Sequence, residues 1–359
     1  MTSPAISVVI PAYRSEGLLE QTLESVLNQT FQDFEIILVD NNASSGTRAI
    51  ADSYRKKFPN LIRLIHEPEQ GVCSARNTGI RESLGTYVAL LDDDDMMSPE
   101  RLEKQLKAAI EHPDASMITC GADFIDHSTG KVISPNVIGA PLKWAILEGY
   151  LKDLFTQISP SGKSDSFVLT YPSTMFFSKQ KAIEAGLFDR RLNPNFGEDY
   201  EFLVRMFGVG KFVTIPEPLA IYRFNAPASI GVRRSPEKLR FLYLQGHKFF
   251  FVLWEGLGQK NPNTKPVFQK IASFHLQLAG RHFLRYEYGT KIGKALLMRA
   301  WKNSPFNLEL FKDALKSRFP KRLLPRLFWF DHQFTDPLPP GIDQHFEESL
   351  FSIPPVWIQ

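Results

Sequence analysis

The sequence predicts an α/β fold, and three observations support this prediction. Short apolar runs alternate with segments of helical periodicity as far as Cys120. Two of the runs end in acidic residues, Asp40 and Asp92, as expected where strands deliver polar groups to the carboxyl edge of an open sheet. The chain also has 359 residues and 43% apolar content, enough for one large domain and an appendage.

The alternating pattern predicts a parallel sheet with right-handed crossovers and helices on both faces. The predicted strands are Ile6–Pro11, Glu35–Asp40, Leu61–Ile65, Tyr87–Leu91 and Ala115–Cys120. The segments between them predict helices over Leu18–Leu27 with Ser15 as a cap, up to about Phe58, within Gly71–Arg81, and over Leu102–Ile110. For the last helix, Ser98 is the expected cap and Pro99 the expected first residue.

Beyond Cys120 the pattern is less regular. Between Asp123 and Ser166 we expect loops and a short helix near Leu142–Phe155, which would line an acceptor cleft. Further elements are predicted at Phe167–Ser178, Lys211–Ile215 and Leu219–Arg223 as strands, with a helix entered at Glu198.

Residues 231–330 have a helical pattern, including a helical hairpin that turns at Tyr288-Gly289, and residues 331–359 predict an irregular tail. From Gly231 onward the chain has 20 Lys and Arg and 10 Asp and Glu, whereas the first 230 residues have 22 basic and 29 acidic residues. This asymmetry suggests contact with an anionic surface such as membrane headgroups, and a basic solvated helix face is the alternative. Phe306–Phe330 fits a membrane interface or packing on the first domain equally well.

Cys73 and Cys120 are the two cysteines, and their spacing is not that of a metal site, so free thiols in a reducing compartment are expected. The N-terminus lacks the pattern of a signal segment, and no apolar run has the length of a membrane span. We therefore expect a cytoplasmic protein, with the inner face of the membrane as a second possibility.

Four consecutive acids, Asp92–Asp95, follow an apolar strand directly. Adjacent carboxylates repel one another unless a cation lies among them, and hard oxygen ligands favour Mg²⁺ or Mn²⁺, shared with a phosphate. The alternative is an acidic solvated turn. The buried strand that leads into the acids favours the metal.

Five motifs in order resemble those of the family 2 glycosyltransferases. They are Pro11-Ala12-Tyr13, Leu38-Val39-Asp40-Asn41, Gly71-Val72-Cys73-Ser74-Ala75-Arg76-Asn77, Leu91–Asp95 and Gly197-Glu198-Asp199. The resemblance covers roughly residues 5–230 and implies a GT-A fold, in which a Rossmann-like mixed sheet is flanked by helices. It also implies a nucleoside-diphosphate sugar donor and transfer with inversion.

The resemblance assigns roles to individual residues. Those implied to bind the nucleotide sugar are Pro11, Tyr13 and Asp40 at the base, Arg76 at the base or phosphate, and Asp92 and Asp93 at the ribose. Asp94 of the Asp-x-Asp (DXD) element is implied to ligate the metal, and Asp95 to hold the turn. A salt bridge to the acidic cluster is the alternative for Arg76.

Glu198 and Asp199 match the family's catalytic acidic pair, with Asp199 implied to be the general base. Their alternative role is to complement the dipole of the helix they begin. One position departs from the family pattern. Asn225 stands where many relatives have a histidine near the metal or diphosphate, so the metal's ligand on that side stays open.

The predicted function is that of an inverting, metal-dependent glycosyltransferase acting on a glycan or lipid-linked acceptor, in cell-surface polysaccharide synthesis. The predicted domains are residues 1–230 for catalysis, 231–330 as a helical region and 331–359 as a tail. We expect no nucleic-acid partner, and peripheral membrane contact is possible. Two alternatives stay open: a non-catalytic nucleotide-sugar-binding protein and a metal-dependent phosphotransferase using aspartyl-phosphate chemistry.

Overall fold

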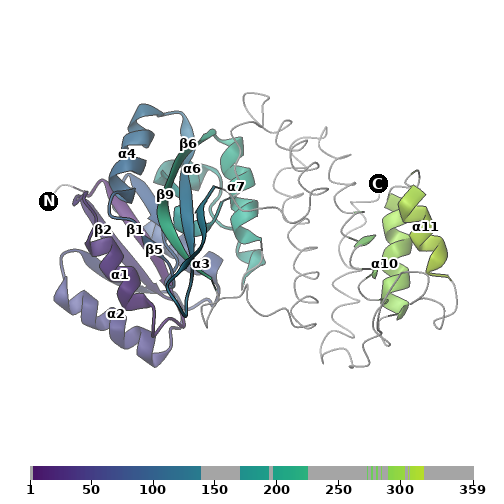
Figure 1. Ribbon diagram of the computed structural model, residues 1–359, viewed down its shortest axis with the longest axis horizontal. Coiled ribbons are helices and arrows are strands. Elements are labelled where there is room, and N and C mark those ends of the chain that lie inside the picture. Colours follow the sequence, from purple (N-terminus) through teal and green to yellow (C-terminus); the bar gives the residue numbers. More distant parts are fainter. Residues whose placement is uncertain are drawn as a thin grey trace. The chain divides into compact units, whose positions relative to one another are not determined.

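A computed structural model of the chain describes residues 3–138, 170–193 and 197–224, and in the C-terminal region mainly the helices α10 (Thr290–Asn303) and α11 (Leu308–Lys316). The chain divides into two compact units, Met1–Ala145 with Phe155–Arg234 and Ile146–Leu154 with Ser235–Gln359. Helices α10 and α11 lie in the region predicted to be helical (Figure 1). The predicted helix at Leu142–Phe155, the turn at Tyr288-Gly289, Asn225 and the tail lie outside the described residues.

Nine strands of the first unit, as far as the structure describes it, form one mixed sheet in the order β3-β2-β1-β4-β8-β6-β9-β5, with β7 paired to β6. They are β1 (Ile6–Ala12), β2 (Phe34–Asp40), β3 (Ile62–His66), β4 (Tyr87–Leu90), β5 (Met96–Met97), β6 (Ala115–Asp126), β7 (Val132–Val137), β8 (Phe176–Ser178) and β9 (Lys211–Phe224). The α/β fold class is therefore confirmed.

Helices cover both faces of this sheet (Figure 1). Apolar residues of β1 and β2 that point to one face, such as Val8 and Ile36, form a core with α1 (Leu19–Leu27), α2 (Ser45–Lys57) and α4 (Arg101–Glu111). On the other face lies α3 (Val72–Glu82), whose Gly79 approaches Val9 and Val39 closely. All seven residues of β2 are buried, because a central parallel strand is covered on both sides.

The parallel prediction was correct for β1 to β4, whose mutual pairings are all parallel. It was wrong for β5, β7 and β8, which pair antiparallel with their neighbours, whereas β6 and β9 again pair parallel. A parallel connection needs a crossover of about a dozen residues or more. The turn between β6 and β7 is too short for one, so these two strands pair as an antiparallel hairpin.

Three predicted boundaries in the second half of the sheet were wrong. Within the described part of Phe167–Ser178, the strand is only Phe176–Ser178, because a short 3-10 helix occupies Pro172–Thr174. The loop expected after Asp123 is instead a hairpin, because β6 continues to Asp126 and pairs with β7. The two strands expected around Pro216-Glu217-Pro218 are one bulged strand, β9. Its register with β6 shifts at Cys120/Gly121, where two prolines lack the N–H group that a regular ladder requires.

Two predicted helix caps were also wrong. Helix α4 starts at Arg101 with Glu100 as N-cap, because the Ser98 hydroxyl donates to the carbonyl of Pro218 (3.0 Å) instead. Helix α1 has Leu18 as N-cap, and Ser15 contributes only its backbone carbonyl to the first turn. Among the described residues, no helix combines the length and apolar character needed to cross a membrane.

Candidate active site

The predicted acidic residues gather at one edge of the sheet, where β1, β2 and β4 end side by side. Ala12 at the end of β1 is paired with Asp40 at the end of β2. One residue later, the Tyr13 N–H donates to the Asp93 carboxylate, with N and Oδ2 2.9 Å apart. The order β2-β1-β4 therefore brings Asp40 and the acidic turn to opposite sides of the same strand end.

Asp40 has polar partners at the β2 end of this edge. Its carboxylate accepts the Ala43 N–H (2.8 Å) and pairs with the half-exposed Arg48 (2.7 Å). Beside it Tyr13 is 40% exposed, with the guanidinium of Arg14 4.9 Å from its ring centre, and Pro11 is half-buried. An exposed aromatic ring next to a carboxylate can stack on a nucleotide base while the carboxylate accepts a ring N–H.

The last acid of the turn, Asp95, is a structural anchor. It is 1% exposed, and its two carboxylate oxygens accept the Ser173 hydroxyl (2.6 Å) and the Arg223 backbone N–H (3.0 Å). Burial, followed by the charges of Asp94 and Asp92, raises its pKa well above the ordinary value. Asp95 thus ties the turn to β9 and to the short helix η1 (Pro172–Thr174), in agreement with its expected role of holding the turn.

Backbone carbonyls of the turn are fixed as well. The Thr22 hydroxyl donates to the carbonyl oxygens of Asp95 (2.7 Å) and Asp93 (3.1 Å). The Arg223 guanidinium, 3% exposed, donates to the carbonyl of Asp94 (2.8 Å) and to the Gln21 side chain (2.7 Å). Donors from α1 and β9 therefore hold the main chain of the turn in one conformation.

The charged forms of the two middle carboxylates, Asp93 and Asp94, are destabilised, mainly by burial. Burial raises the pKa of Asp93 to about 6. Burial, and then the charges of Asp92 and Asp93, raise the pKa of Asp94 to about 7. Within the described part of the chain, no other residue donates a hydrogen bond to the Asp94 carboxylate. A cation placed there would relieve this repulsion.

The described residues fit a divalent cation only in part. In residues 3–138, 170–193 and 197–224, no three His, Cys, Asp or Glu side chains converge on a common point that could hold a metal ion. The half-buried Asp94 carboxylate is a hard oxygen donor of the kind that Mg²⁺ and Mn²⁺ prefer. A cation held here would therefore need oxygen atoms from a bound ligand in addition to Asp94.

Arg76 on α3 connects the acidic turn to a distant acidic pair. Its guanidinium is 3% exposed, with Nη2 2.8 Å from Asp92 Oδ1 and Nη1 3.0 Å from Glu198 Oε1. Burial alone would lower the pKa of Arg76, but the Asp92 and Glu198 carboxylates outweigh it and raise the pKa. Of the two partners that the sequence left open for Arg76, the structure shows the salt bridge to the acidic cluster.

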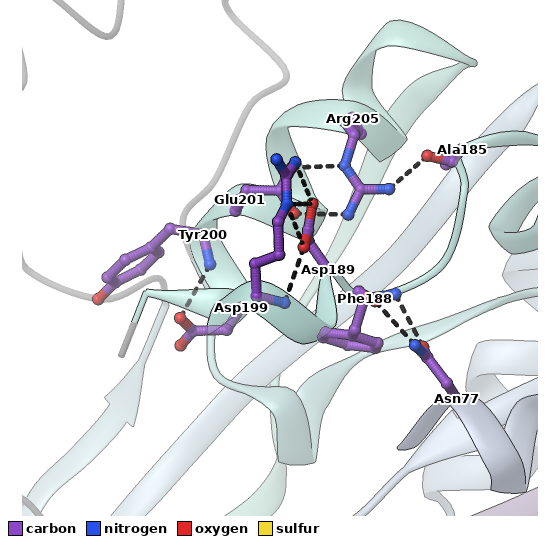
Figure 2. Close-up of polar contacts among 9 residues, drawn as sticks. Asn77, Ala185, Phe188, Asp189, Asp199, Tyr200, Glu201 and Arg205 are labelled. Atoms are coloured by element: carbon purple, nitrogen blue, oxygen red, sulfur yellow. Dashed lines mark hydrogen bonds and ion pairs between the residues drawn. The ribbon is translucent and has the colours of Figure 1, made fainter. Parts of the chain in front are cut away.

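Asp199 follows Glu198 in the first turn of α7 (Glu198–Gly208), which begins after Gly197 in a left-handed conformation. One Asp199 oxygen accepts the Tyr200 backbone N–H (2.8 Å), and the carboxylate points away from the ion pairs deeper along the helix (Figure 2). Burial, and then the charge of Glu198, raise the pKa of Asp199 to about 7. A carboxylate of this pKa is suited to accept a proton near neutral pH.

Contacts between α7 and the loop around Ala185–Phe188 fix the direction of the helix (Figure 2). The Asn77 amide exchanges two 2.8 Å hydrogen bonds with the backbone of Phe188, and the Phe188 ring stacks on Phe202 of α7 with centroids 4.1 Å apart. Arg205 pairs with Glu201 (2.5 Å) and donates to the carbonyl of Ala185. Because Arg76 precedes Asn77, one turn of α3 contacts both the beginning of α7 and the loop that supports it.

Sequence reasoning missed several residues around the site. Asn193 accepts the Cys73 N–H (3.0 Å) and donates to the Ser74 hydroxyl (2.9 Å), and so caps α3 from a distant loop. Tyr171 lies near Asp199, and burial followed by that charge raises its pKa to about 12. The Arg223 contacts with the acidic turn were missed too. Neither an arginine near the end of a strand nor an asparagine in a loop gives any sign in the sequence of a partner a hundred residues away.

Taken together, a polar strand edge, an acidic turn and a carboxylate with a pKa near neutrality lie on connected elements of one unit. The fold is of the GT-A class. The sequence model of Glycosyl transferase family 2 matches residues 7–175. The uncharacterized glycosyltransferase MJ1057 of Methanocaldococcus jannaschii is 30% identical over 246 residues, which are 68% of this chain and 79% of that protein. The chain belongs to glycosyltransferase family 2.

Other relatives match over a shorter stretch. EpsH of Bacillus subtilis, named as a candidate glycosyltransferase, is 33% identical over 43% of this chain and 44% of its own length. The matched part of the chain thus spans less than half of EpsH. Among solved structures, S. aureus TarS 1-349 in complex with UDP-GlcNAc has a TM-score of 0.51 at 14% identity, covering 94% of this chain and 95% of that chain. This likeness concerns the fold alone.

Proposed function

We propose that this protein transfers a sugar, with inversion, from a nucleoside-diphosphate donor to a hydroxyl group of a glycan or lipid-linked acceptor. The observation that carries the proposal is the double ion pair of Arg76 with Asp92 and Glu198. It brings the acidic turn and the start of α7 to one guanidinium. A donor bound along the turn would then present its anomeric carbon near Asp199.

In the proposed reaction, Asp199 acts as general base. Its carboxylate takes the proton of the acceptor hydroxyl while that oxygen attacks the anomeric carbon from the face opposite the diphosphate. The bond between the anomeric carbon and the diphosphate oxygen breaks in the same displacement, so the configuration inverts. A positioned base of this kind contributes roughly 10²–10⁴-fold to the rate. Glu198 supports Asp199 by raising its pKa and by holding Arg76.

Donor binding is assigned to the edge formed by β1, β2 and the acidic turn. Pro11, Tyr13 and Asp40 would contact the base, and Asp92 and Asp93 the ribose. Both terminal nitrogens of Arg76 already form ion pairs, one with Asp92 and one with Glu198. We therefore assign Arg76 a positioning role rather than direct contact with the base or phosphate. This assignment follows from burial, because a guanidinium 3% exposed offers little surface to a ligand.

A divalent cation, Mn²⁺ or Mg²⁺, is proposed as cofactor with Asp94 as its protein ligand. When bound, such a cation would neutralise the charge that develops on the departing diphosphate. The raised pKa of Asp94 and its lack of a described partner support this choice. The mannosyltransferase PcManGT from Pyrobaculum calidifontis, solved in complex with GDP-Man and Mn²⁺, has a TM-score of 0.50 to this chain at 16% identity.

The acceptor class is proposed from relatives. TuaG of Bacillus subtilis, named as a candidate glycosyltransferase of teichuronic acid biosynthesis, is 36% identical over 35% of this chain and 47% of its own length. We therefore propose a role in cell-surface polysaccharide synthesis, in the cytoplasm and at the inner face of the membrane if the acceptor is lipid-linked. We also keep the division into a catalytic domain over residues 1–230, a helical region over 231–330 and a tail as a proposal.

Calorimetry with Mn²⁺ and a panel of nucleoside diphosphates tests donor binding, and sugar release or transfer tests turnover. We expect one diphosphate to bind only with the metal. We expect Asp94→Asn to bind the diphosphate no more tightly with Mn²⁺ than without it. Asp199→Asn should still bind the diphosphate, but its turnover rate should fall at least a hundredfold. Asp52→Asn on the surface of α2 is the matched control. Absence of binding by every diphosphate, together with full turnover of Asp199→Asn, would refute the proposal.

A further inference from the structure

Helix α11 in the C-terminal unit buries polar and small side chains. Asp313 and Ala314 of the helix, and Ser317 directly after it, are each at most 2% exposed. The Asp313 carboxylate accepts hydrogen bonds from Gln277 (2.7 Å) and from Arg281 Nε (2.5 Å). These polar contacts fix which side of the helix faces inward, although a surface helix ordinarily turns its apolar side to the core.

Large apolar side chains of α11 consequently face outward. Leu308, Phe311 and Leu315 are 62%, 41% and 48% exposed, and their spacing of three and four residues puts them on one stripe. Phe306, just before the helix, is fully exposed. Helix α10 lies beside α11 (Figure 1), and its Trp301 contacts Phe311 with ring centroids 5.6 Å apart. We call Phe306, Leu308, Phe311 and Leu315 the α11 apolar face.

Basic residues border this face. Lys312 and Arg318 are exposed, and Lys316 is half-buried. On a helical projection of α11, Lys312 lies next to Leu308 and Leu315. Arg318 lies in the turn directly after the helix. The region from Gly231 onward has twice as many Lys and Arg as Asp and Glu, 20 against 10. An apolar stripe flanked by cations complements a surface that is apolar inside and anionic at its rim.

We propose that the α11 apolar face docks onto an anionic membrane surface, with Phe306 and the three helical side chains entering the boundary between headgroups and acyl chains. This geometry is that of a helix lying in the interface plane, where Lys and Arg contact anionic headgroups. Phe and Leu are residues that such interfacial helices typically have on their apolar side. The inference concerns the C-terminal unit and does not depend on the proposed reaction.

A second copy of the chain fits this face less well. In a two-fold contact the same patch would meet itself, which would bring Lys312 and Arg318 close to their counterparts. Stable protein–protein interfaces also bury about 800 Å² on each partner, more than four side chains supply. A bilayer has neither difficulty, because a few inserted side chains and nearby cations are enough for reversible binding.

Co-sedimentation of the full chain with vesicles tests the proposal. One set of vesicles is pure phosphatidylcholine and the other contains phosphatidylglycerol as anionic lipid. We expect the parent chain to bind the anionic vesicles more tightly. The triple variant Phe306→Asp, Leu308→Asp, Leu315→Asp should bind them at least tenfold more weakly. The matched control replaces three residues of similar exposure in the first unit, Leu84→Asp, Ile110→Asp and Ile133→Asp, and should bind like the parent.

Three results would overturn the proposal. The first would be that the parent chain does not bind anionic vesicles. The second would be that the triple variant binds them as tightly as the parent does. The third would be that, without lipid, the parent is a dimer and the triple variant is a monomer. Circular dichroism checks that each variant is folded. If the triple variant unfolds, Phe306→Asp alone decides, because a fully exposed side chain supports no packing. It should weaken vesicle binding several-fold, and unchanged binding would reject the membrane.

Discussion

The guanidinium of Arg76 reaches Glu198, 122 residues further along the chain, with Nη1 and Oε1 3.0 Å apart. Its other terminal nitrogen holds Asp92 at 2.8 Å. One buried cation therefore determines how far the acidic turn lies from the start of α7. The relative position of the two halves of the candidate site depends on this side chain.

Arg76→Gln is expected to destabilise the protein and to abolish turnover. Removing one member of a buried ion pair leaves the other charges unpaired and typically costs about 3–5 kcal/mol. Urea denaturation measures this loss. Arg55→Gln, which breaks an exposed pair with Asp52 on α2, is the control and should leave stability unchanged within error. If Arg76→Gln were as stable as the control, the linking role would be wrong.

Asp199 gives a pH-dependent prediction for activity. With a pKa of about 7, the carboxyl group is protonated below neutrality and cannot accept the acceptor's proton. We expect kcat/KM to fall about tenfold per pH unit below pH 7. A profile of kcat/KM between pH 5 and 8 measures this. A flat profile would contradict the assignment of Asp199 as the base.

The same raised pKa predicts that Asp199→Asn stabilises the free protein. The folded pKa of about 7 lies above the ordinary 3.8, so folding disfavours the charged form and stability falls as pH rises from about 4 to 7. Replacing the carboxyl group by an amide should raise the melting temperature by about 2 °C or more at pH 8, and by less at pH 4. A lower melting temperature at pH 8 than that of the parent would contradict the cited direction.

Asn77→Ala is expected to loosen the support of α7. Its amide exchanges two hydrogen bonds with Phe188, and alanine would leave a buried N–H and a buried carbonyl without partners. The expected loss is about 2 kcal/mol or more in urea denaturation. The exposed Asn60→Ala serves as control. Equal stability of the two variants would show that Phe188 finds other partners.

Replacement by alanine should change the free energy of unfolding differently at two glycines, Gly79 and Gly208. A Cβ at Gly79 would lie 2.3 Å from Val9 Cγ1 and 3.2 Å from Val39 Cγ2, so Gly79→Ala forces α3 away from the sheet and should cost about 1–3 kcal/mol. At Gly208, the last residue of α7, a Cβ meets nothing within 4 Å. Gly208→Ala should be neutral or add up to about 0.5 kcal/mol of stability, because alanine favours the helix. Thermal unfolding of the pair checks the contrast.

Local sequence patterns were sufficient for the first half of the fold. Strands β1 to β4 match the predicted strands to within one residue at each end, because buried parallel strands are short, continuous apolar runs. The same patterns failed for β5, β7 and β9. A two-residue strand has no period to detect, and Pro216 and Pro218 look like a strand end when they are a bulge within one strand.

For the candidate site, the sequence by itself determined that carboxylates follow β2 and β4, and that a further acidic pair begins α7. Parallel strands then place the first two groups at one edge. Tertiary structure alone decided which groups hold Asp95, that Arg76 pairs with Asp92 and Glu198, and that Leu308, Phe311 and Leu315 of α11 face outward. Periodicity records contacts within a few residues, whereas these relationships join side chains far apart in the chain, and only packing selects the partners.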